Sequence, residues 1–396
     1  MASAELLVVA GEASGDVLGG ELLAALRARR PQLRAFGMGG PRLVAAGLQP
    51  LFDVSEISVV GFTEVLPRLP RIWRVFRALV KAAATRRPAA AVLVDAPDFN
   101  LRLARKLKAL GIPVVFYVSP TVWAWRRGRV KQIARDVEKM LCILPFEEAF
   151  YRPYGVKAVY VGSPVAARLP APAEAAVFRQ RLGLQVHRPT LAVLPGSRAS
   201  ELRRCLQPLV ESAALVEKDH PGLQVVVPIA PGVDAALVAA AFQARGLQPL
   251  LVAGCTAEVA GAADVALVTS GTAALEAGLM LRPLVVVYRV SALSALLARL
   301  LVKVRFVSLI NLLAGRRLIP EVLQEALTPA NVLAEVRRVW DEGPERRSMV
   351  AGLREVRTLL GTAPASERAA DEVLEVLEAK GRLPEGPRVV RGAPSQ

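Results

Sequence analysis

Short runs of apolar residues alternate with longer segments of helical spacing along most of the chain. Runs that are apolar throughout are typical of strands buried on both faces, as in the parallel sheets of βαβ units. In the first half we expect strands at residues 5–10, 33–37, 90–95, 114–118 and 140–144, and helices at 15–30 and 101–110. In the second half we expect strands at residues 190–194, 223–228, 248–252, 265–268 and 284–288.

The two sets predict an α/β chain with two Rossmann-like, doubly wound parallel sheets, in domains that face each other across a cleft. The first domain is expected at residues 1–165 and the second at 190–345, joined by a proline-rich linker at 166–189. Residues 346–380 are expected to form helices that can return to the first domain, and 381–396 to form a frayed tail.

The chain is strongly basic, with 51 Lys and Arg against 35 Asp and Glu and a formal net charge of +16. Such a charge attracts nucleic acid, acidic lipid or phosphorylated substrates, although a GC-rich genome, which favours arginine codons, produces the same bias. Three scattered cysteines without a pairing pattern favour a reducing compartment. We expect no signal peptide, and no apolar run reaches the roughly 18 residues of a membrane span. Contact with a membrane surface stays open.

Two turns in the second half, at residues 194–201 and 269–276, each follow an expected strand and open a helix. Their glycine and hydroxyl residues predict unpaired backbone N–H groups at a positive helix end, which is a seat for phosphate. Arg198 can clamp two phosphate oxygens, and Glu276 can accept hydrogen bonds from ribose hydroxyls. The pattern predicts a nucleoside diphosphate held by Gly196, Ser197, Arg198, Ser270, Gly271, Thr272 and Glu276.

Two acidic residues follow the expected strand at 90–95. Ligands of open α/β sheets bind at the carboxyl ends of the strands. Asp95 ends its strand at this edge, where partial burial suits a carboxylate to act as a general base. Asp98 follows Pro97 and precedes a helix, so a helix N-cap is the simpler interpretation of it.

Other loops carry residues with two open interpretations. Ser14, in the turn at 11–16, either serves the site or caps the first helix, and the glycine spacing there is not a dinucleotide fingerprint. Trp123 and Trp125 share one loop, where they either contact a ligand or plug the core.

Asn311 and Gln324 are amides among apolar residues, and each either reaches a ligand or satisfies backbone groups internally. The two histidines, His187 and His220, lie far apart, and no Cys-x-x-Cys occurs. We therefore expect neither a metal site nor a cofactor, and no Ser–His–Asp arrangement is recognisable.

Apolar and basic residues interleave between positions 62 and 81, and the prolines predict that a regular helix begins only near Pro70. A basic amphipathic helix with Trp and Phe favours contact with a membrane interface. A helix packed on the core with a solvated arginine face is the alternative. The expected lipid contacts are Val65, Leu66, Leu69, Ile72, Trp73 and Phe76. The segment 291–306 has the same character.

Taken together, several of these segments resemble lipid-A-disaccharide synthases. The matching motifs lie at residues 11–16, 95–100, 118–126, 144–147, 194–198, 270–276 and 311–315. The match runs from near the start of the chain to about Gln324, and the motifs are specific only as a set.

The resemblance implies a GT-B fold and an inverting glycosyltransferase that needs neither metal nor cofactor. It would transfer 2,3-diacylglucosamine from UDP-2,3-diacylglucosamine to the 6-hydroxyl of 2,3-diacylglucosamine 1-phosphate and release UDP, in lipopolysaccharide biosynthesis. The family is cytoplasmic and peripheral on the inner membrane, so an anionic membrane surface is an implied partner. Its members also tend to form homodimers by exchanging C-terminal portions, which is a second possibility for residues 346–380.

Carried over by position, Asp95 resembles the family's base and Ser14 an essential hydroxyl. The positions that match the family's donor site are Arg198, Glu276, Asn311 and Gln324. The chain departs from the family at a hinge where a His and an Asp are usual, because Ser163 and Ala167 stand there, and no role is carried over to these two residues. Ile310 also replaces a usual proline.

Three other functions fit part of the pattern. A UDP-sugar epimerase would share the two-domain plan and the nucleotide site, and product analysis separates it from a transferase. A nucleic-acid-binding protein would gather its arginines with stacking aromatics, whereas here they interleave with aliphatic residues, so no nucleic acid is expected. A lipid carrier would not need the two phosphate-binding turns.

Overall fold

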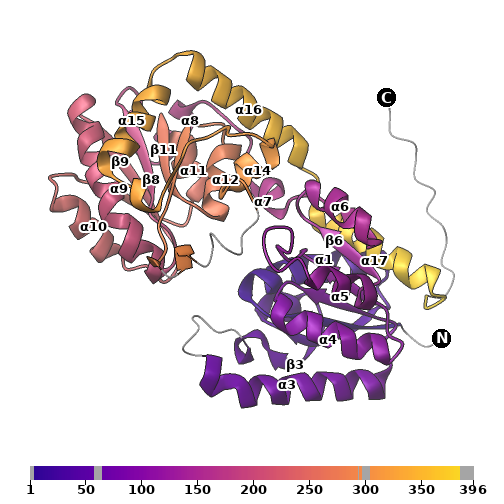
Figure 1. Ribbon diagram of the computed structural model, residues 1–396. Coiled ribbons are helices and arrows are strands. Elements are labelled where there is room, and N and C mark those ends of the chain that lie inside the picture. The colour runs from indigo at the N-terminus through magenta and orange to yellow at the C-terminus, as the bar shows by residue number, and fades with distance from the viewer. Residues whose placement is uncertain (1–3, 58–64, 293, 297–303, 384–396) are drawn as a thin grey trace, which may run out of the picture. The chain divides into compact units, whose positions relative to one another are not determined.

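The structure, a computed structural model, describes residues 4–57, 65–292, 294–296 and 304–383. The chain divides into two compact units, of which the first comprises Met1–Pro164 and Ala363–Gln396 and the second comprises Val165–Thr362 (Figure 1). The first unit has a sheet of seven strands and the second a sheet of six. The paired strands of both sheets are parallel, so the predicted fold class is confirmed.

The first unit alternates strands and helices, and its sheet has the order β3-β2-β1-β4-β5-β6-β7. Its strands are β1 (Glu5–Ala10), β2 (Arg34–Gly39), β3 (Leu48–Asp53), β4 (Ala90–Val94), β5 (Val114–Tyr117), β6 (Lys139–Cys142) and β7 (Ala158–Tyr160). Its helices are α1 (Ala13–Arg29), α2 (Pro41–Ala45), η1 (Val54–Glu56), α3 (Val65–Arg86), α4 (Pro97–Ala109), α5 (Arg129–Asp136), α6 (Phe146–Tyr151), η3 (Arg152–Tyr154) and α17 (Ala365–Ala379).

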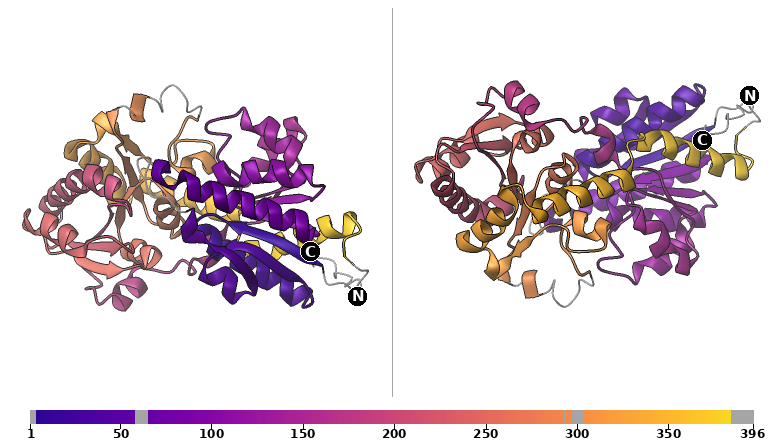
Figure 2. Two further views of the ribbon diagram at one scale, coloured as in Figure 1. Left: turned by 90° about the horizontal axis from the view of Figure 1, so that it is seen from below. Right: turned by 90° about the horizontal axis from the view of Figure 1, so that it is seen from above.

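Different helices cover the two faces of this sheet. Side chains along a strand alternate between faces, and in β1 Leu6 and Val8 pack with α1 and α17. Leu7 and Val9 point the other way and pack with α3, α4 and α5. Figure 2 shows α3 and α17 on opposite sides of the sheet. Burial on both faces is the reason why these strands are apolar throughout.

The second unit repeats this plan with the strand order β10-β9-β8-β11-β12-β13. Its strands are β8 (Thr190–Leu194), β9 (Gln224–Ile229), β10 (Leu250–Ala253), β11 (Val265–Thr269), β12 (Leu284–Tyr288) and β13 (Glu321–Leu323). Its helices are α7 (Pro164–Arg168), which begins at the boundary, α8 (Ala175–Arg181), α9 (Ala199–Asp219), α10 (Ala235–Gln243), α11 (Thr256–Ala262), α12 (Thr272–Leu279), α14 (Leu309–Ala314), η4 (Gln324–Ala326), α15 (Pro329–Trp340) and α16 (Pro344–Leu360).

Every strand expected from the sequence is present, with small differences at the ends. Three strands were not predicted from the sequence. They are β3 and β7, at the two edges of the first sheet, and β13, at one edge of the second. Many of their residues are exposed or half-buried, so no continuous apolar run marks them.

Helix α3 begins at Val65, so the prediction that the helix begins near Pro70 is wrong. Pro67 falls in the first turn, where backbone N–H groups have no intrahelical partner and the missing N–H of proline removes no hydrogen bond. Pro70 is accommodated inside the helix. The beginning of the amphipathic segment, residues 62–64, lies outside the described residues.

Residues 166–189 belong to the second unit and contain α8, which packs against α11. Phe178 of α8 is buried, and Arg179 donates a hydrogen bond of 2.8 Å to the carbonyl of Ala262.

The helices of residues 346–380 are divided between the two units, because α16 belongs to the second unit and α17 to the first. Arg29 of α1 pairs with Asp371 of α17 at 3.1 Å, within one chain. Exchange of this segment between two chains stays a prediction.

Candidate active site

The first sheet reverses its strand order at β1 and β4, because β1 lies between β2 and β4. The loops that follow strands on either side of such a switch point diverge, and ligands bind in the crevice between them. The turns after β1 and β4 carry Ser14 and Asp95. These turns are in close contact, since a Cβ atom at Gly11 would lie only 2.3 Å from the Cβ of Ala96. The structure therefore brings the two predicted catalytic residues to one edge of the sheet.

Ser14 lies in the first turn of α1 and is exposed. The N-cap of α1 is Glu12, and no side chain caps the helix. The interpretation of Ser14 as a helix cap is therefore wrong, and its hydroxyl is available to a ligand.

The backbone at Asp95 is strained. The N–H of Asp95 continues the sheet with a 2.9 Å hydrogen bond to the carbonyl of Tyr117. Asp95 and Ala96 then both adopt left-handed backbone conformations, with φ of 53° and 44°. Each such residue costs about 1–3 kcal/mol when it is not glycine, and such strain is found where function requires an unusual geometry.

The Asp95 carboxyl is half-buried, and its pKa is raised above the ordinary value. The main cause is burial, which disfavours the charged form, and the negative charge of nearby Glu12 adds to it. A hydrogen bond from the N–H of Ala96 opposes the shift in pKa. A carboxylate with a raised pKa binds a proton more tightly and is a better general base than an exposed one.

Asp98 has the opposite environment. Its side chain is 68% exposed, accepts a hydrogen bond from Arg129, and lies 3.2 Å from the guanidinium of Arg126. Partial burial pushes its pKa up, but these arginines more than compensate and lower the pKa overall. Asp98 is also not a helix cap, because Ala96 is the N-cap of α4. Of the two acids, Asp95 has the properties of a base.

The two tryptophans of the loop after β5 have different environments. Trp123 is buried, and its indole N–H donates a 3.1 Å hydrogen bond to Glu147. Trp125 is 39% exposed, with the guanidinium of Arg126 lying 4.2 Å from its ring centroid. Trp123 therefore plugs the core, whereas Trp125 presents a ring on which a ligand can stack.

Glu147 at the start of α6 is a buried acid whose environment the sequence did not reveal. It also accepts the backbone N–H of Leu144 at 3.1 Å. Burial raises the pKa of Glu147 to about 7. Glu147 thus fixes the loop that carries Trp125 by holding Trp123 beneath it.

The second sheet has its own switch point at β8 and β11. The turns that follow these strands line a cavity of about 190 Å³. This volume is below the ~300–1,000 Å³ of pockets that enclose a whole small ligand, so the cavity can hold only part of one. Its lining is Leu194, Pro195, Gly196, Ser197, Arg198, Glu201, Pro228, Ala230, Thr256, Thr269, Ser270, Gly271, Thr272 and Ala273.

Two backbone N–H groups of the turn after β8 already have an acceptor within the protein. One carboxylate oxygen of Glu201 accepts the N–H groups of Ser197 and Arg198, at 2.9 and 3.2 Å. Gly196, with φ of 109°, makes room for this carboxylate, since a Cβ there would lie 2.7 Å from it. The Arg198 guanidinium is still accessible to an anion. One of its nitrogens contacts Glu201 at 2.9 Å, but the side chain is 73% exposed.

The turn after β11 keeps the expected character. Ser270 completes the sheet by donating to the carbonyl of Val287 at 2.9 Å, and Gly271 is the N-cap of α12. No side chain caps this helix. The first N–H groups of a helix have no intrahelical partner, so those of Thr272 and Ala273, two residues that line the cavity, can donate to an anion.

Glu276 lies one turn further along α12 and is half-buried. Burial is the cause of its raised pKa, and it has no ion-pair or hydrogen-bond partner among the described residues. A partly desolvated carboxylate without a partner is a good acceptor for a ligand hydroxyl.

Asn311 does not line the cavity. It is fully buried and donates to the carbonyl of Ile319 and to Glu321, while its carbonyl oxygen accepts the N–H groups of Leu318 and Ile319. The structure therefore favours the internal role that the sequence left open. Gln324 similarly accepts the N–H of Val290 at 3.2 Å and does not line the cavity. Direct contact of either amide with a donor stays a prediction.

Helix α3 divides its predicted lipid contacts between core and surface. Phe76 is buried in the core of the first unit, so the prediction that it contacts lipid is wrong. Ile72 is partly buried against the same core. Leu69 and Trp73 are 47% and 51% exposed. The side chains of Val65 and Leu66 lie outside the described residues.

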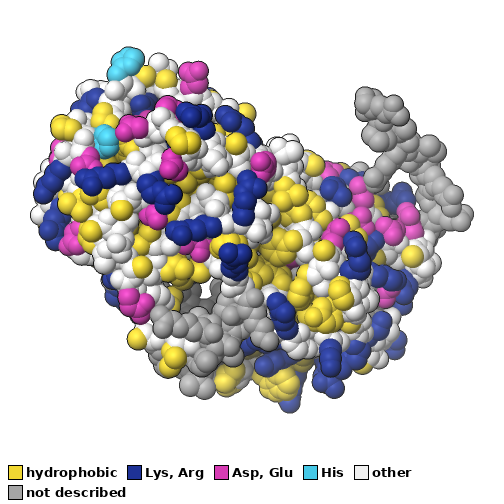
Figure 3. Space-filling view, turned by 45° about the horizontal axis from the view of Figure 1, so that its top comes forward, with side chains coloured by type: hydrophobic (Ala, Val, Ile, Leu, Met, Phe, Trp, Pro, Cys, Tyr) yellow, Lys and Arg dark blue, Asp and Glu magenta, His cyan; other side chains and the backbone are white. Residues whose placement is uncertain are grey.

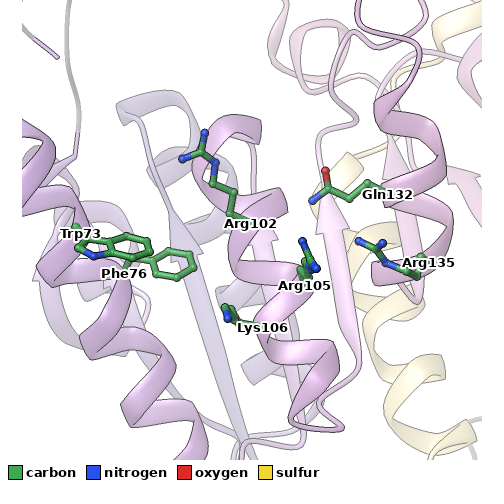
Figure 4. A pocket seen from close by; sticks show the side chains of 7 residues that line it. All are labelled: Trp73, Phe76, Arg102, Arg105, Lys106, Gln132 and Arg135. Carbon is green, nitrogen blue, oxygen red and sulfur yellow. The ribbon is translucent and has the colours of Figure 1, made fainter. Parts of the chain in front are cut away.

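A shallow hollow of about 680 Å³ runs across α3, α4 and α5 (Figure 4). Its cations include Arg105 and Lys106, which have no carboxylate partner in the described part of the chain. The three helices together contain thirteen Lys and Arg but only two Asp. Both Asp residues are already paired with arginine. The lining residues are Trp73, Phe76, Arg102, Arg105, Lys106, Gln132 and Arg135.

Other site types find little support in the described residues. No group of His, Cys, Asp and Glu there could hold a metal ion. None of the described helices combines the length and the apolar character that crossing a membrane requires. On the face shown in Figure 3, Lys and Arg side chains are dispersed among apolar and acidic ones.

Two parallel sheets, each with polar residues at its switch point, place the chain in the class of GT-B-like folds. The calicheamicin glycosyltransferase CalG4 has a similar fold, with a TM-score of 0.59 and 18% identity over 96% of this chain and 99% of that one. UDP-GlcNAc 2-epimerase from Neisseria meningitidis, bound to UDP-GlcNAc, is similar with a TM-score of 0.60 and 11% identity over 95% and 100%. Transferases and epimerases share this fold, so the fold alone does not separate them.

Sequence similarity does separate them. The family model described as lipid-A-disaccharide synthetase matches residues 6–370. The lipid-A-disaccharide synthase of Myxococcus xanthus is 60% identical over 372 residues, which are 94% of this chain and 97% of that protein. The chain therefore belongs to the lipid-A-disaccharide synthase family, and it is a glycosyltransferase of lipid A biosynthesis.

Proposed function

We propose that the protein transfers 2,3-diacylglucosamine from UDP-2,3-diacylglucosamine to the 6-hydroxyl of 2,3-diacylglucosamine 1-phosphate, with Asp95 as the general base. The observation that carries this proposal is the environment of Asp95. It is a half-buried carboxylate with a raised pKa, at the switch point of its sheet and at the same sheet edge as the exposed Ser14.

In the proposed reaction Asp95 removes the proton of the acceptor's 6-hydroxyl as its oxygen attacks the anomeric carbon of the donor. The bond between that carbon and the diphosphate breaks on the opposite face, so the configuration inverts and UDP leaves. Ser14 orients the acceptor or the donor sugar at the same edge of the first sheet.

The second unit would hold the leaving group. Negative charge grows on the diphosphate as the bond breaks, and fixed donors stabilise such charge best. The N–H groups of Thr272 and Ala273 at the N-terminus of α12 and the exposed guanidinium of Arg198 would supply them. Glu276 would accept a hydrogen bond from the ribose of the donor.

The first unit would contact the cytoplasmic surface of the inner membrane through α3. Support comes from the exposed Leu69 and Trp73 and from the excess of cations on α3, α4 and α5. Each Lys or Arg near an anionic lipid surface contributes about 1 kcal/mol. The same surface would bring the acylated substrates within reach of Asp95.

The test is an assay of the purified protein with both substrates, in which mass spectrometry detects the disaccharide 1-phosphate. Asp95→Asn should lower kcat by about 10²- to 10⁴-fold, because it removes the base. Asp98→Asn, which alters an exposed and arginine-paired acid, should lower kcat far less. Arg198→Ala should lower kcat by about 10²- to 10³-fold through loss of a charge-stabilising donor.

Circular dichroism should show that all three variants fold as the wild type does. Near-normal turnover by Asp95→Asn would remove the base assignment. Absence of the disaccharide with the wild-type protein would refute the proposed reaction itself.

A further inference from the structure

The turn that presents Asp95 needs a group that holds it in place. Asp95 and Ala96 are consecutive left-handed residues, and neither is glycine. Ala96 is the N-cap of α4 and has no side chain that could form a cap hydrogen bond. Strained backbone of this kind persists only where its surroundings fix it. The strain therefore points to a nearby residue that stabilises this conformation.

Asn100, in the first turns of α4, is in contact with the strained segment. It is fully buried, and its side-chain NH2 donates to the carbonyl of Asp95 at 2.8 Å and to that of Val94 at 3.1 Å. A longer contact of 3.5 Å reaches the carbonyl of Val9 at the end of β1. The backbone N–H of Asn100 donates to the carbonyl of Ala96 at 2.9 Å. Asn100 thus contacts the turn at several successive residues.

These contacts bear on the orientation of the Asp95 carboxylate. The peptide group between Asp95 and Ala96 has its carbonyl held by Asn100. The N–H of the same peptide group donates to the Asp95 carboxylate. A rotation of this peptide group would therefore move the carboxylate and break its hydrogen bond.

The rest of the side chain has no competing role. The oxygen of the Asn100 amide has no hydrogen-bond partner among the described residues, although a buried acceptor without a partner is costly. The hydrogen bonds of the Asn100 side chain are therefore those that its NH2 group donates to backbone carbonyls of the turn. The close approach of Gly11 to Ala96 leaves no space for the turn to relax toward β1.

We propose that Asn100 is a positioning residue for glycosyl transfer, which fixes the Asp95–Ala96 peptide group and thereby aims the Asp95 carboxylate at the acceptor hydroxyl. The inference rests on the proposed function of Asp95. It assigns Asn100 no contact with substrate.

The test is a double-mutant cycle of Asn100→Ala and Asp95→Ala. Asn100→Ala should lower kcat by about 10- to 100-fold, as expected for a misplaced catalytic group. In the Asp95→Ala background the same substitution should change the residual rate less than about twofold, because no base remains to be positioned. Affinity for UDP, measured by calorimetry, should stay unchanged and shows that the second unit is intact.

The pH profile gives a second readout. If the peptide group rotates, Asp95 loses the Ala96 hydrogen bond that lowers its pKa. The acid limb of kcat/KM should then move to higher pH in Asn100→Ala. The isosteric Asn100→Asp lacks the NH2 donors and should lower kcat as Asn100→Ala does. A residue that only stabilises the fold would leave this limb in place.

Asn331→Ala is the matched control. Asn331 also lies in the first turn of a helix and donates to a carbonyl five residues earlier, that of Ala326 at 2.9 Å, but it is exposed and belongs to α15. The Asn331→Ala variant should have the same activity as the wild type.

Equal losses from Asn100→Ala with and without Asp95 would overturn the inference, and so would a wild-type kcat and pH profile in Asn100→Ala and Asn100→Asp. If Asp95→Ala itself retained full activity, the proposed base would fail, and that result is distinct from both of these.

Discussion

At the residue scale, the two acids that follow β4 have opposite environments, which raise the pKa of Asp95 and lower that of Asp98. Asp95 ends an apolar strand, which predicts the base there rather than at Asp98, and the opposite pKa shifts agree with that prediction. The effect of Glu12 on Asp95 could not be predicted, because it depends on how two turns distant in sequence meet. The contacts of Asn100 with Asp95 and of Glu201 with the turn at Gly196 are local, but they depend on left-handed backbone conformations that the residue types do not reveal.

The pH dependence of activity should report the Asp95–Glu12 interaction. The base acts when deprotonated, so kcat/KM falls as the pH falls through the Asp95 pKa. Because the charge of Glu12 raises that pKa, Glu12→Gln should lower it and shift the acid limb of the profile to lower pH.

Glu217→Gln in α9 removes the same charge from the other unit and should leave the limb unchanged. An acid limb at the same pH in Glu12→Gln and the wild type would contradict this interaction.

At the scale of elements, α3 shows where periodicity stops being informative. Its apolar residues recur at helical spacing whether they face the core or the lipid, and the spacing cannot distinguish the two. The structure assigns Phe76 to the core, where its ring stacks on Trp73 with centroids 5.3 Å apart, and leaves Trp73 itself half-exposed. The core interpretation therefore holds for Phe76, whereas lipid contact through Leu69 and Trp73 stays a prediction.

Replacing the exposed pair should separate lipid binding from folding. The double variant Leu69→Ser/Trp73→Ser should sediment less with anionic liposomes while its unfolding transition stays close to that of the wild type. Phe76→Ser should instead destabilise the first unit by about 3–5 kcal/mol, as large truncations of buried aromatic side chains do.

Leu237→Ser, which changes a leucine of α10 that is 53% exposed, is the control and should bind liposomes normally. If the double variant sedimented as the wild type does, α3 would not be the lipid contact.

At the scale of the whole molecule, the two parallel sheets and the sheet edges that carry the candidate site residues could be predicted, because strands buried on both faces are apolar and ligands of such sheets bind at the carboxyl ends of the strands. The edge strands β3 and β7 could not be predicted, because exposed and half-buried residues interrupt their apolar pattern. The sequence also did not predict that α16 belongs to the second unit and α17 to the first. Both helices have the same amphipathic character, and only packing distinguishes their partners.

The charge of +16 should make membrane association depend on salt and on lipid charge. We expect the protein to sediment with vesicles that contain phosphatidylglycerol and to be released as the salt concentration rises from about 0.05 to 0.5 M, where surface charges are screened over a few ångströms. Vesicles of phosphatidylcholine alone should retain little protein. Equal binding to both vesicle types at all salt concentrations would mean that the arginines do not contribute to adhesion.

The position of α17 has a consequence for biosynthesis. Leu6 and Val8 of the first strand share their core with Val373 and Leu377 of the last helix. A ribosome therefore has to translate the entire second unit before the first can bury that face of its sheet. The half of the protein that emerges earliest is completed last, and until then it exposes an apolar surface that a chaperone can recognise.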